Sequence, residues 1–535
     1  MLGALAFAAP ASASTFCVPA FFEGCASGGG NQAVSDLQLA MNTATSDGQA
    51  DTVRLAPGTY SRATSFTTSG SDDLTVIGSG RNASDITSTA SINTYVVNLF
   101  NTRNVTFRDL SVTAPASFPN NSGAGAAMVM LGDTFERVDF RSRNDGSSGV
   151  IGITYGGTFR DVTVKGIDGG SIGLAIGSTT SVEFCSPGKR QLIVEDVVIE
   201  NADGGITNDC PTVEATVDGA LITGTNSAIY AGDGSKMSVR NVLIRSAEGP
   251  PIQAINSEDT GDTELSVSHA TVIAGADPGQ PAIRGWIYDF AGINDVRIDV
   301  RNSVFSGFAS PWRLEAPSGI SKGDAYLDIG YSNFPVAGTA TGDSQITQGL
   351  GNSNSAPMFV GPGDYRPAMG SPLIDAGEVI SGPPVMDTDL AGNDRPVDGN
   401  DDGVAAPDVG AFEYQPPAPT CETDPGLCPD QVKPVVSKVR FSFRAGKGGS
   451  LRMKLSEASK VKVVLKPTPK GKRKARLLTR KAKAGILTIK LGRKQLKPGK
   501  YRLSIVATDA AGNKSDPLVR KVTVKQKKRK RPAGS

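Results

Sequence analysis

Hydrophobic and polar residues follow one repeated pattern about nine times between residues 72 and 334. Each copy reads apolar-x-apolar, a polar pair, apolar-x-apolar and then a Gly-rich turn, as in VTFRDLSV (105–112), LIVEDVVI (192–199) and MSVRNVLI (237–244). Alternation with a period of two predicts short β-strands rather than helices. A strand repeat of this length predicts a solenoid, because one coil cannot bury its own apolar side chains and the coils must therefore stack.

The copies align on the residue that follows the polar pair, with steps of 22 to 36 residues between them. If the coils stack in this register, the aligned residues form one column along the solenoid. The predicted column consists of Leu74, Leu110, Val138, Val162, Val197, Ala220, Val242, Ala270, Ser303 and Ser332.

A helical pattern precedes the first coil. Residues 31–45 place Val34, Leu37, Met41 and Ala44 on one helical face. We expect this helix to cap the solenoid, because an open end exposes both the core and unpaired strand edges.

Strand patterns of a different kind follow a Pro-rich linker. Residues 434–526 contain alternating runs such as KVRFSF, SKVKVVLKP and KYRLSIVATDAAGN, bounded by Gly, Pro or charged residues. Such runs predict an antiparallel β-sandwich. The chain is therefore expected to be all-β, with a solenoid followed by a small sandwich.

The formal net charge of +2 hides two segments of opposite sign. Residues 1–432 carry 22 Lys and Arg against 50 Asp and Glu, whereas residues 433–535 carry 33 against 3. This excess predicts salt-sensitive binding of residues 433–535 to an anionic polymer, such as a teichoic, teichuronic or acidic capsular polymer of a cell envelope. Nucleic acid would bind through the same counterion release, but no base-reading element is visible and no specific nucleic acid is expected. For the basic C-terminal tail, a solvated disordered segment is the alternative.

The N-terminus and the cysteines predict export. MLGALAFAAPASA (1–13) reads as a signal peptide, although the first basic residue is Arg54, which indicates a misassigned start codon or an atypical signal. A buried β-strand is the alternative for this segment. No run of 18 apolar residues predicts a membrane span. Six cysteines fit an oxidising compartment, and we expect three disulfides rather than a zinc site: Cys17–Cys25, Cys185–Cys210 and Cys421–Cys428.

The solenoid resembles a known family. A helix, a strand ending in APGTY (56–60) and turns such as NADGGI (201–206) and IDGGSIG (167–173) resemble secreted right-handed parallel β-helix proteins of the pectate-lyase-like superfamily, over about residues 31–355. The resemblance implies lyases or hydrolases of acidic polysaccharides. Two family signatures are not matched, since Trp286-Ile287-Tyr288-Asp289 departs from Trp-Ile-Asp-His at two positions and Gly-His-Gly is absent. The single histidine, His269, lies in a strand pattern and is expected to be packed or turn-facing.

Two further resemblances concern the C-terminal half. Residues 356–377 and 387–414 resemble the choice-of-anchor type Q segment at the end of secreted bacterial β-helices, which implies placement at the cell surface. Residues 497–515 resemble the last hairpin of bacterial Ig-like or fibronectin-III-like modules. The predicted division is a signal peptide (1–13), a capped parallel β-helix (31–355), a closing segment (356–414), a Pro/Cys linker (415–433), a basic β-sandwich (434–526) and a disordered tail (527–535).

One set of turn aspartates is a candidate catalytic group. Asp145, Asp168 and Asp203 occupy equivalent turns of successive coils, and each precedes a glycine. Stacking would place them about 5 Å apart, where they could act as paired carboxylates or bind Ca²⁺. The alternative is ordinary Asp-Gly turn chemistry repeated by the solenoid.

The closing segment contains a candidate calcium loop. Asp398-Gly399-Asn400-Asp401-Asp402-Gly403 matches the first half of an EF-hand loop, whereas Val409 stands where the bidentate Glu belongs. The predicted ligands are Asp398, Asn400, Asp402 and Asp408, with Glu413, Asp387 or Asp389 as further oxygen donors. An acidic surface turn is the alternative.

These observations predict a secreted or cell-surface β-helix protein. The solenoid is expected to bind an extended extracellular polysaccharide, and residues 433–535 to attach to an anionic envelope polymer. The alternative functions are a polysaccharide lyase or glycoside hydrolase, and a cationic binding protein in which the solenoid is a passive spacer.

Overall fold

The computed structural model divides the chain into two compact units, residues 1–416 and 417–535. Within residues 13–525 it describes all positions except 69–72, 90–94, 100–103, 115–126, 129–132, 143–150, 153–155, 167–171, 178–184, 186–189, 247, 289–291, 320–321, 336, 381–387, 418–429, 431 and 469–473. Residues 1–12 of the predicted signal peptide, the Cys421–Cys428 pair and the C-terminal tail lie outside the described residues.

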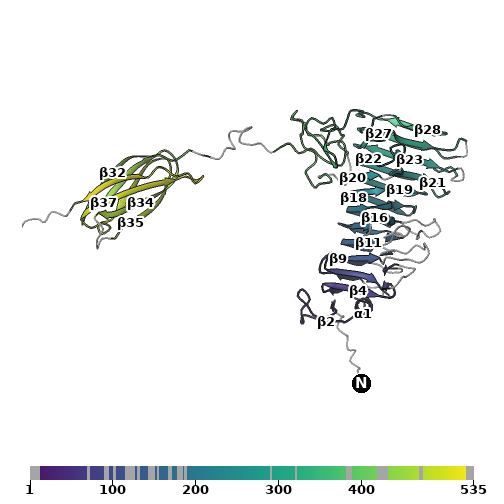
Figure 1. Cartoon of the computed structure of the whole chain (residues 1–535), viewed down its shortest axis with the longest axis horizontal. Coiled ribbons are helices and arrows are strands. Elements are labelled where there is room, and N and C mark those ends of the chain that lie inside the picture. Colours follow the sequence, from purple (N-terminus) through teal and green to yellow (C-terminus); the bar gives the residue numbers. More distant parts are fainter. Residues whose placement is uncertain are drawn as a thin grey trace, which may run out of the picture. The chain divides into compact units, whose positions relative to one another are not determined.

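The first unit is a stack of coils built around one long parallel sheet (Figure 1). Its strands pair in parallel from coil to coil, as in Leu192–Ala215–Met237–Leu265–Ile298–Leu327. The 18 described strands of this long sheet are β1 (Thr15–Val18), β2 (Asn31–Ala33), β3 (Asp51–Leu55), β4 (Gly58–Arg62), β6 (Leu74–Ile77), β7 (Ser84–Ser88), β9 (Val105–Ala114), β11 (Thr134–Ser142), β13 (Gly157–Arg160), β14 (Thr163–Gly166), β16 (Arg190–Glu200), β18 (Val213–Thr225), β20 (Lys236–Ser246), β22 (Thr263–Ile273), β24 (Val296–Arg301), β25 (Val304–Ser306), β27 (Ala325–Gly330) and β29 (Ser344–Gln348).

Two further parallel sheets complete the coils. The side sheet contains β15 (Ile172–Gly177), β17 (Ala202–Asn208), β19 (Ser227–Gly232), β21 (Ile252–Asn256), β23 (Pro281–Ile287), β26 (Ser310–Glu315) and β28 (Thr339–Thr341). A short sheet in the earlier coils contains β5 (Phe66–Thr67), β8 (Val97–Asn98), β10 (Ala127–Met128) and β12 (Ile151–Gly152). The first unit is therefore a parallel β-helix, as the sequence predicts.

From β9 to β27, each coil bends at one residue with a positive φ. This bend residue is the second member of the polar pair in the sequence repeat, and it divides the long strands or separates two shorter ones. Asn and Asp tolerate this left-handed conformation better than most residues, and Gly adopts it freely. The bend residues, with φ between 48° and 79°, are Asp109, Arg137, Asp161, Asp196, Gly219, Asn241, His269, Asn302 and Tyr331.

The predicted column of aligned residues is confirmed from Leu110 to Ser332. Direct pairs such as Leu110–Val138, Val197–Ala220 and Val242–Ala270 stack in it. The prediction is wrong at Leu74, which pairs with Val105. The strand of that coil is interrupted after β6, and it is β7 that pairs with the second half of β9, through Asp85 and Ser111.

Apolar side chains fill the interior of the β-helix as columns. Phe107, Phe135 and Phe159 stack with ring centroids 5.5 Å apart and nearly parallel planes. On the side sheet, Ile229, Ile252, Ile283 and Trp312 form a second buried column. Burial against the coils above and below supplies the apolar contact that no single coil has.

The N-terminal end carries a short helix, α1 (Leu37–Ala44), which is shorter than the expected 31–45 because Asn31–Ala33 forms β2. Asp36 caps the helix by accepting a hydrogen bond from the Leu39 amide at 2.9 Å. Leu37, Ala40, Met41 and Ala44 are buried against the first coils. None of the helices in the described chain is long and apolar enough to span a membrane.

Two of the three predicted disulfides are confirmed. Cys17–Cys25 closes a small loop at the N-terminal end, and Cys185–Cys210 joins neighbouring coils, with Cα atoms 5.7 Å apart in each. After the last coil, the closing segment forms the hairpin β30 (Phe359–Gly361) and β31 (Asp364–Pro367), and Leu373 and Val409 pack against Val304 of β25.

The second unit is a small antiparallel β-sandwich, which confirms the predicted fold class. One sheet holds β32 (Val436–Arg444), β33 (Gly448–Leu455) and β36 (Gly485–Leu491). The other, here called the four-stranded face sheet, holds β34 (Ser459–Thr468), β35 (Arg476–Ala482), β37 (Gly499–Thr508) and β38 (Leu518–Val524). Alternate residues such as Leu451, Val463 and Leu503 are fully buried between the sheets and give this unit its own core.

Candidate functional site

A groove with a volume of about 600 Å³ lies on the outer face of the long sheet, before the bend. It crosses six consecutive strands of the long sheet's first halves, from Glu214 on β18 to Gln345 on β29. Because the strand register is unbroken here, outward-facing residues of successive coils line up in two rows along the groove.

The first row begins with four residues of alternating charge, which are followed by a tyrosine and a glutamine. Lys236 Nζ lies 2.7 Å from Glu264 Oε1, and the guanidinium of Arg297 lies 4.5 Å from the ring centroid of Tyr326. Such an arginine–aromatic pair presents a flat, partly apolar surface with polar edges. The full row is Glu214, Lys236, Glu264, Arg297, Tyr326 and Gln345.

The second row begins with hydroxyl groups, continues with a pair of carboxylates and ends at Thr347 of β29. Thr216, Ser238 and Ser266 precede Asp299 and Asp328, which are direct neighbours on β24 and β27. Arg301 Nη2 lies 2.9 Å from Asp299 and 3.1 Å from Asp328, so the two bound carboxylate oxygens lie within about 6 Å of each other. Arg301 Nε also contacts Glu378 at 3.2 Å, which sets one guanidinium among three carboxylates.

The surroundings of Asp299 favour its protonated form. Burial raises the pKa of Asp299, and the neighbouring Asp328 and Glu378 raise it further, whereas Arg301 lowers it. Carboxyl pairs in which one member holds its proton to a higher pH than the other are the arrangement used for general acid catalysis on sugars.

A second polar surface lies on the side sheet. The ring centroids of Trp286 and Tyr288 are 4.0 Å apart, and the Arg284 guanidinium lies 3.9 Å above the Trp286 ring. Arg284 is also held by Glu315 at 3.2 Å. This surface repeats the arginine–aromatic chemistry of the groove on another face of the β-helix.

Asp209, at the end of β17, is the most perturbed carboxyl on this side. Burial raises its pKa to about 7, and the charges of Asp233 and Glu258 contribute. Its Oδ1 atom is buried without a hydrogen-bond partner. Gly232 on the next coil leaves room for this oxygen, since a Cβ there would lie 2.0 Å from it.

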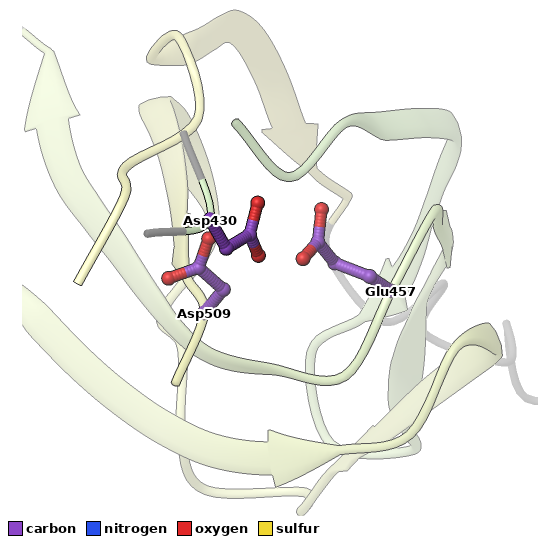
Figure 2. Close-up of side chains that lie close together, drawn as sticks. All are labelled: Asp430, Glu457 and Asp509. Atoms are coloured by element: carbon purple, nitrogen blue, oxygen red, sulfur yellow. The ribbon is translucent and has the colours of Figure 1, made fainter. Parts of the chain in front are cut away.

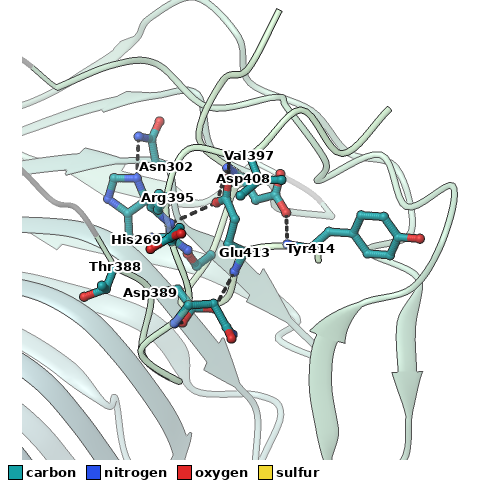
Figure 3. Close-up of polar contacts among 12 residues, drawn as sticks. His269, Asn302, Thr388, Asp389, Arg395, Val397, Asp408, Glu413 and Tyr414 are labelled. Atoms are coloured by element: carbon teal, nitrogen blue, oxygen red, sulfur yellow. Dashed lines mark hydrogen bonds and ion pairs between the residues drawn. The ribbon is translucent and has the colours of Figure 1, made fainter. Parts of the chain in front are cut away.

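The closing segment is fixed to the β-helix by a buried polar network (Figure 3). Arg395 and Glu413, 1% and 0% exposed, form an ion pair at 3.0 Å. Glu413 also accepts hydrogen bonds from the amides of Val397 and Asp408, and its own amide donates to Asp389. The buried charges are therefore almost completely satisfied, as a low-dielectric site requires.

Bend residues of the coils provide the surface on which this network rests. Arg395 Nη1 donates to Asn241 at 3.2 Å, and the Asn302 side chain exchanges two hydrogen bonds of 2.8 Å with the backbone of Glu378. His269 is 2% exposed, and its Nε2 contacts Asn302 Nδ2 at 2.9 Å. Burial lowers the pKa of His269 well below its usual value, so it is a packed bend residue, as predicted.

The structure separates the predicted calcium ligands. Asp398, Asn400 and Asp402 share one turn, where their oxygens accept backbone amides of Asp402, Gly403 and Val404. Asp408 is buried elsewhere and accepts hydrogen bonds from the amides of Asp375 and Tyr414. Of the suggested additional donors, Glu413 and Asp389 belong to the Arg395 network, and Asp387 lies outside the described residues. Calcium binding at this loop stays a prediction.

The predicted catalytic column cannot be placed. Asp145 and Asp168 lie outside the described residues, and of Asp203 the structure describes only the backbone, in β17. The role of these aspartates stays a prediction.

One close group of carboxylates was not predicted. Asp430, Glu457 and Asp509 of the second unit turn toward one another, with carboxylate oxygens within 4.8 Å (Figure 2). Glu457 lies two residues before β34 and Asp509 directly follows β37, and these strand ends pair through Lys460 and Thr508. Pairing these strand ends would have brought Glu457 and Asp509 together, whereas Asp430 lies before the predicted sandwich.

The groove residues were missed for a related reason. Asp299 and Asp328 occur in IDVRN and LDIGY, where each reads as an ordinary outward polar position of an amphipathic strand. The signal that distinguishes them is the coil register, which places two acids side by side with Arg301.

Comparisons with known proteins give only distant likenesses. No protein-family model and no curated protein matches the sequence. Similar solved structures include the catalytic unit of a thermostable GH87 alpha-1,3-glucanase from Streptomyces thermodiastaticus strain HF3-3 (13% identity, TM-score 0.40, covering 66% of this chain and 72% of that one). Others are the A-module of the mannuronan C-5 epimerase AlgE6 from Azotobacter vinelandii (15%, 0.36, 60% and 96%) and PfbA, a surface adhesin of Streptococcus pneumoniae (12%, 0.34, 60% and 88%). A glucanase, an epimerase and an adhesin differ in function, and these likenesses assign no function to this chain.

The buried ion pair gives a first prediction. Glu413→Gln leaves the Arg395 guanidinium buried without a counter-charge, and we expect it to lower the stability of the closing segment by about 3–5 kcal/mol. Hydrogen exchange of the amides in residues 388–414 measures this loss. The control is Asp364→Asn, which breaks the exposed pair with Arg366 and should cost less than about 1 kcal/mol. Equal protection in the two variants would contradict the role of the buried pair.

Asp209 gives a prediction about pH. Its folded-state pKa of about 7 lies above the unfolded value of about 3.9, so the folded state binds this proton more tightly. The resulting stability is present below about pH 4 and is lost as pH rises through 7. We expect Asp209→Asn to reduce the fall in thermal-unfolding midpoint between pH 5 and pH 8, measured by tryptophan fluorescence.

The exposed Asp277 provides the matched control for this experiment. Asp277→Asn should leave the pH dependence of the unfolding midpoint as in the unmodified protein. A pH dependence that Asp209→Asn does not change would show that this carboxyl is not protonated preferentially in the folded state.

Proposed function

We propose that this protein is secreted and binds an extended carbohydrate polymer in the groove of its β-helix, while its cationic sandwich attaches it to an anionic polymer of the cell envelope. One observation carries the first part: two rows of polar side chains run in unbroken register along the groove. A polymer that lies along the β-helix axis meets outward polar side chains at the same two positions of each of these six strands.

The dimensions and chemistry of the groove support a linear sugar polymer. Successive coils are about 4.8 Å apart, so six strands extend over about 24 Å. The rows offer hydroxyl, amide, carboxylate and guanidinium groups, which suit the hydroxyls of sugars. Tyr326, with Arg297 over its ring, provides a flat surface on which the apolar face of a sugar ring can pack.

Several features support an extracellular location. The two disulfides require an oxidising compartment to persist. The N-terminal signal-like segment and the resemblance of residues 356–414 to a choice-of-anchor segment favour the cell surface. Calcium at Asp398, Asn400, Asp402 and Asp408 remains part of the proposal, with the turn of the first three residues as its core.

The alternative function is a polysaccharide lyase or glycoside hydrolase. The specific observation in its favour is the pair of Asp299 and Asp328 in the groove, with the pKa of Asp299 raised by burial. In a hydrolase, the protonated carboxyl would donate its proton to the leaving oxygen, and the ionised partner would activate water or attack the anomeric carbon.

The binding proposal is tested by removing the arginine–aromatic pair of the groove. We expect Arg297→Ala/Tyr326→Ala to weaken binding of the preferred polysaccharide about tenfold, the effect of losing roughly 1.4 kcal/mol. Affinity electrophoresis or calorimetry against acidic and neutral polysaccharides, with calcium and with EDTA, measures the loss. New reducing ends or unsaturated uronides in the same mixtures would favour the enzymatic alternative.

The side sheet offers a matched control variant. Arg284→Ala/Trp286→Ala removes a pair of the same chemistry from another face and should leave the affinity within about threefold, which corresponds to roughly 0.65 kcal/mol. If this control loses binding and the groove variant does not, the polymer lies on the side sheet and the assignment of the groove is wrong. A chain that binds no polysaccharide would refute the carbohydrate part of the proposal.

A further inference from the structure

The outer face of the four-stranded face sheet carries a row of three cations. Lys466 on β34 pairs directly with Arg502 on β37, and Arg502 pairs directly with Lys521 on β38. Directly opposed residues of antiparallel strands project from the same face, and all three side chains are exposed. Like charges in these positions destabilise a sheet, so this cation row costs the fold stability.

No acidic side chain in the described part of the module compensates the cation row. Residues 433–535 contain three acids, and none forms an ion pair with a described Lys or Arg. Glu457 precedes β34, whereas Asp509 and Asp516 lie in the connection from β37 to β38, so all three occupy the same end of the sheet. The cation row lies farther along the strands, where only Lys, Arg, Ser, Thr and apolar residues of the described strands face outward.

An apolar strip runs beside the cation row. Leu477 pairs with Val464, Val464 with Ser504, and Ser504 with Val519. Leu477 is 57% exposed and Val519 is 43% exposed. The face therefore offers positive charge and apolar contact side by side, two residues apart along each strand.

This combination distinguishes between anionic partners. An acidic glycan has negative groups along one edge and apolar ring faces beside them, which match the row and the strip. Single-stranded nucleic acid is held by aromatic side chains on which bases stack, and the cation row and the strip contain none. The spacing of neighbouring strands, about 4.8 Å, places a cation opposite successive units of an extended glycan.

We infer that a linear anionic glycan binds across the strands of the face sheet, with its acidic groups on Lys466, Arg502 and Lys521 and its sugar rings on the apolar strip. This inference rests on the proposed attachment of the sandwich to an anionic polymer and assigns that attachment to one face. The absence of acids from this region and the exposed apolar side chains have one common explanation, a partner that covers both.

The experiment uses the full chain with Arg297→Ala/Tyr326→Ala, so that the groove does not contribute, and polygalacturonate as the probe. In this background, Lys466→Gln/Arg502→Gln/Lys521→Gln should weaken binding at least tenfold. The slope of log affinity against log salt should fall by about 2, because about 0.7 counterion per contact is no longer released. An unchanged or raised unfolding midpoint shows that the triple variant is folded.

The other sheet supplies a control with equal charge removal. Arg440, Arg452 and Lys454 are exposed on β32 and β33, and Arg440→Gln/Arg452→Gln/Lys454→Gln should weaken binding less than threefold. Equal losses in the two triple variants would overturn the cation row but leave attachment to an anionic polymer intact. No binding of polygalacturonate, dextran sulfate or lipoteichoic acid by the parent would refute that attachment as well.

Three more outcomes decide the nature of the partner. Tighter binding to single-stranded DNA, or to phosphatidylglycerol vesicles, than to polygalacturonate would overturn the glycan. Salt-sensitive self-association of the parent that the row variant abolishes would assign the face to the acidic unit of a second copy, again against the inference. Preference for polygalacturonate, lost in the row variant alone, supports it.

Discussion

From β9 to β27, the β-helix depends on one left-handed residue in each coil. Without it, a strand of the long sheet would run straight and the coil could not close around its apolar core. Residues with a side chain bear a cost of about 1–3 kcal/mol in this conformation, which only the packing of neighbouring coils can offset. Stacking of the bend residues thereby fixes the strand register between neighbouring coils. The same register holds in both halves of each long strand, including the half that forms the groove.

The bend column also connects the β-helix to its closing segment. Asn241 and Asn302 have the short polar side chains that tolerate a positive φ, and those same side chains bind Arg395 and the backbone of Glu378. The asparagines that the positive φ favours are thus also able to hydrogen-bond the closing segment. The buried Arg395–Glu413 pair adds little net stability of its own, since desolvation opposes its attraction. It does make any other placement of the segment costly, because a displaced partner would leave a buried charge unpaired.

A structural feature could be predicted from the sequence where it is determined within one segment of the chain, and not where it depends on contacts between distant segments. Alternation within a strand is local, so the column from Leu110 to Ser332 could be predicted, whereas the interrupted coil after Leu74 required knowledge of its partners. Asp299 and Asp328 look like any outward strand position until coil stacking places Arg301 between them. The loop around Asp398 carried a recognisable spacing, but its supposed partners are buried in other contacts that no spacing rule includes. Glu413 pairs with Arg395, 18 residues away, and Asp408 accepts the amides of Asp375 and Tyr414.

The arrangement of charges in the sandwich differs from the one that favours solubility. A soluble surface is best served by mixing both signs, and this module instead collects Asp430, Glu457 and Asp509 within 4.8 Å. Carboxylates that lie this close repel one another, and the cations at the opposite end of the sheet are left without acidic neighbours. Both effects oppose folding, and neither improves solubility over an interspersed arrangement. A sheet that retains opposed cations and exposed apolar residues together therefore has a surface whose free energy is lowest when a partner covers it.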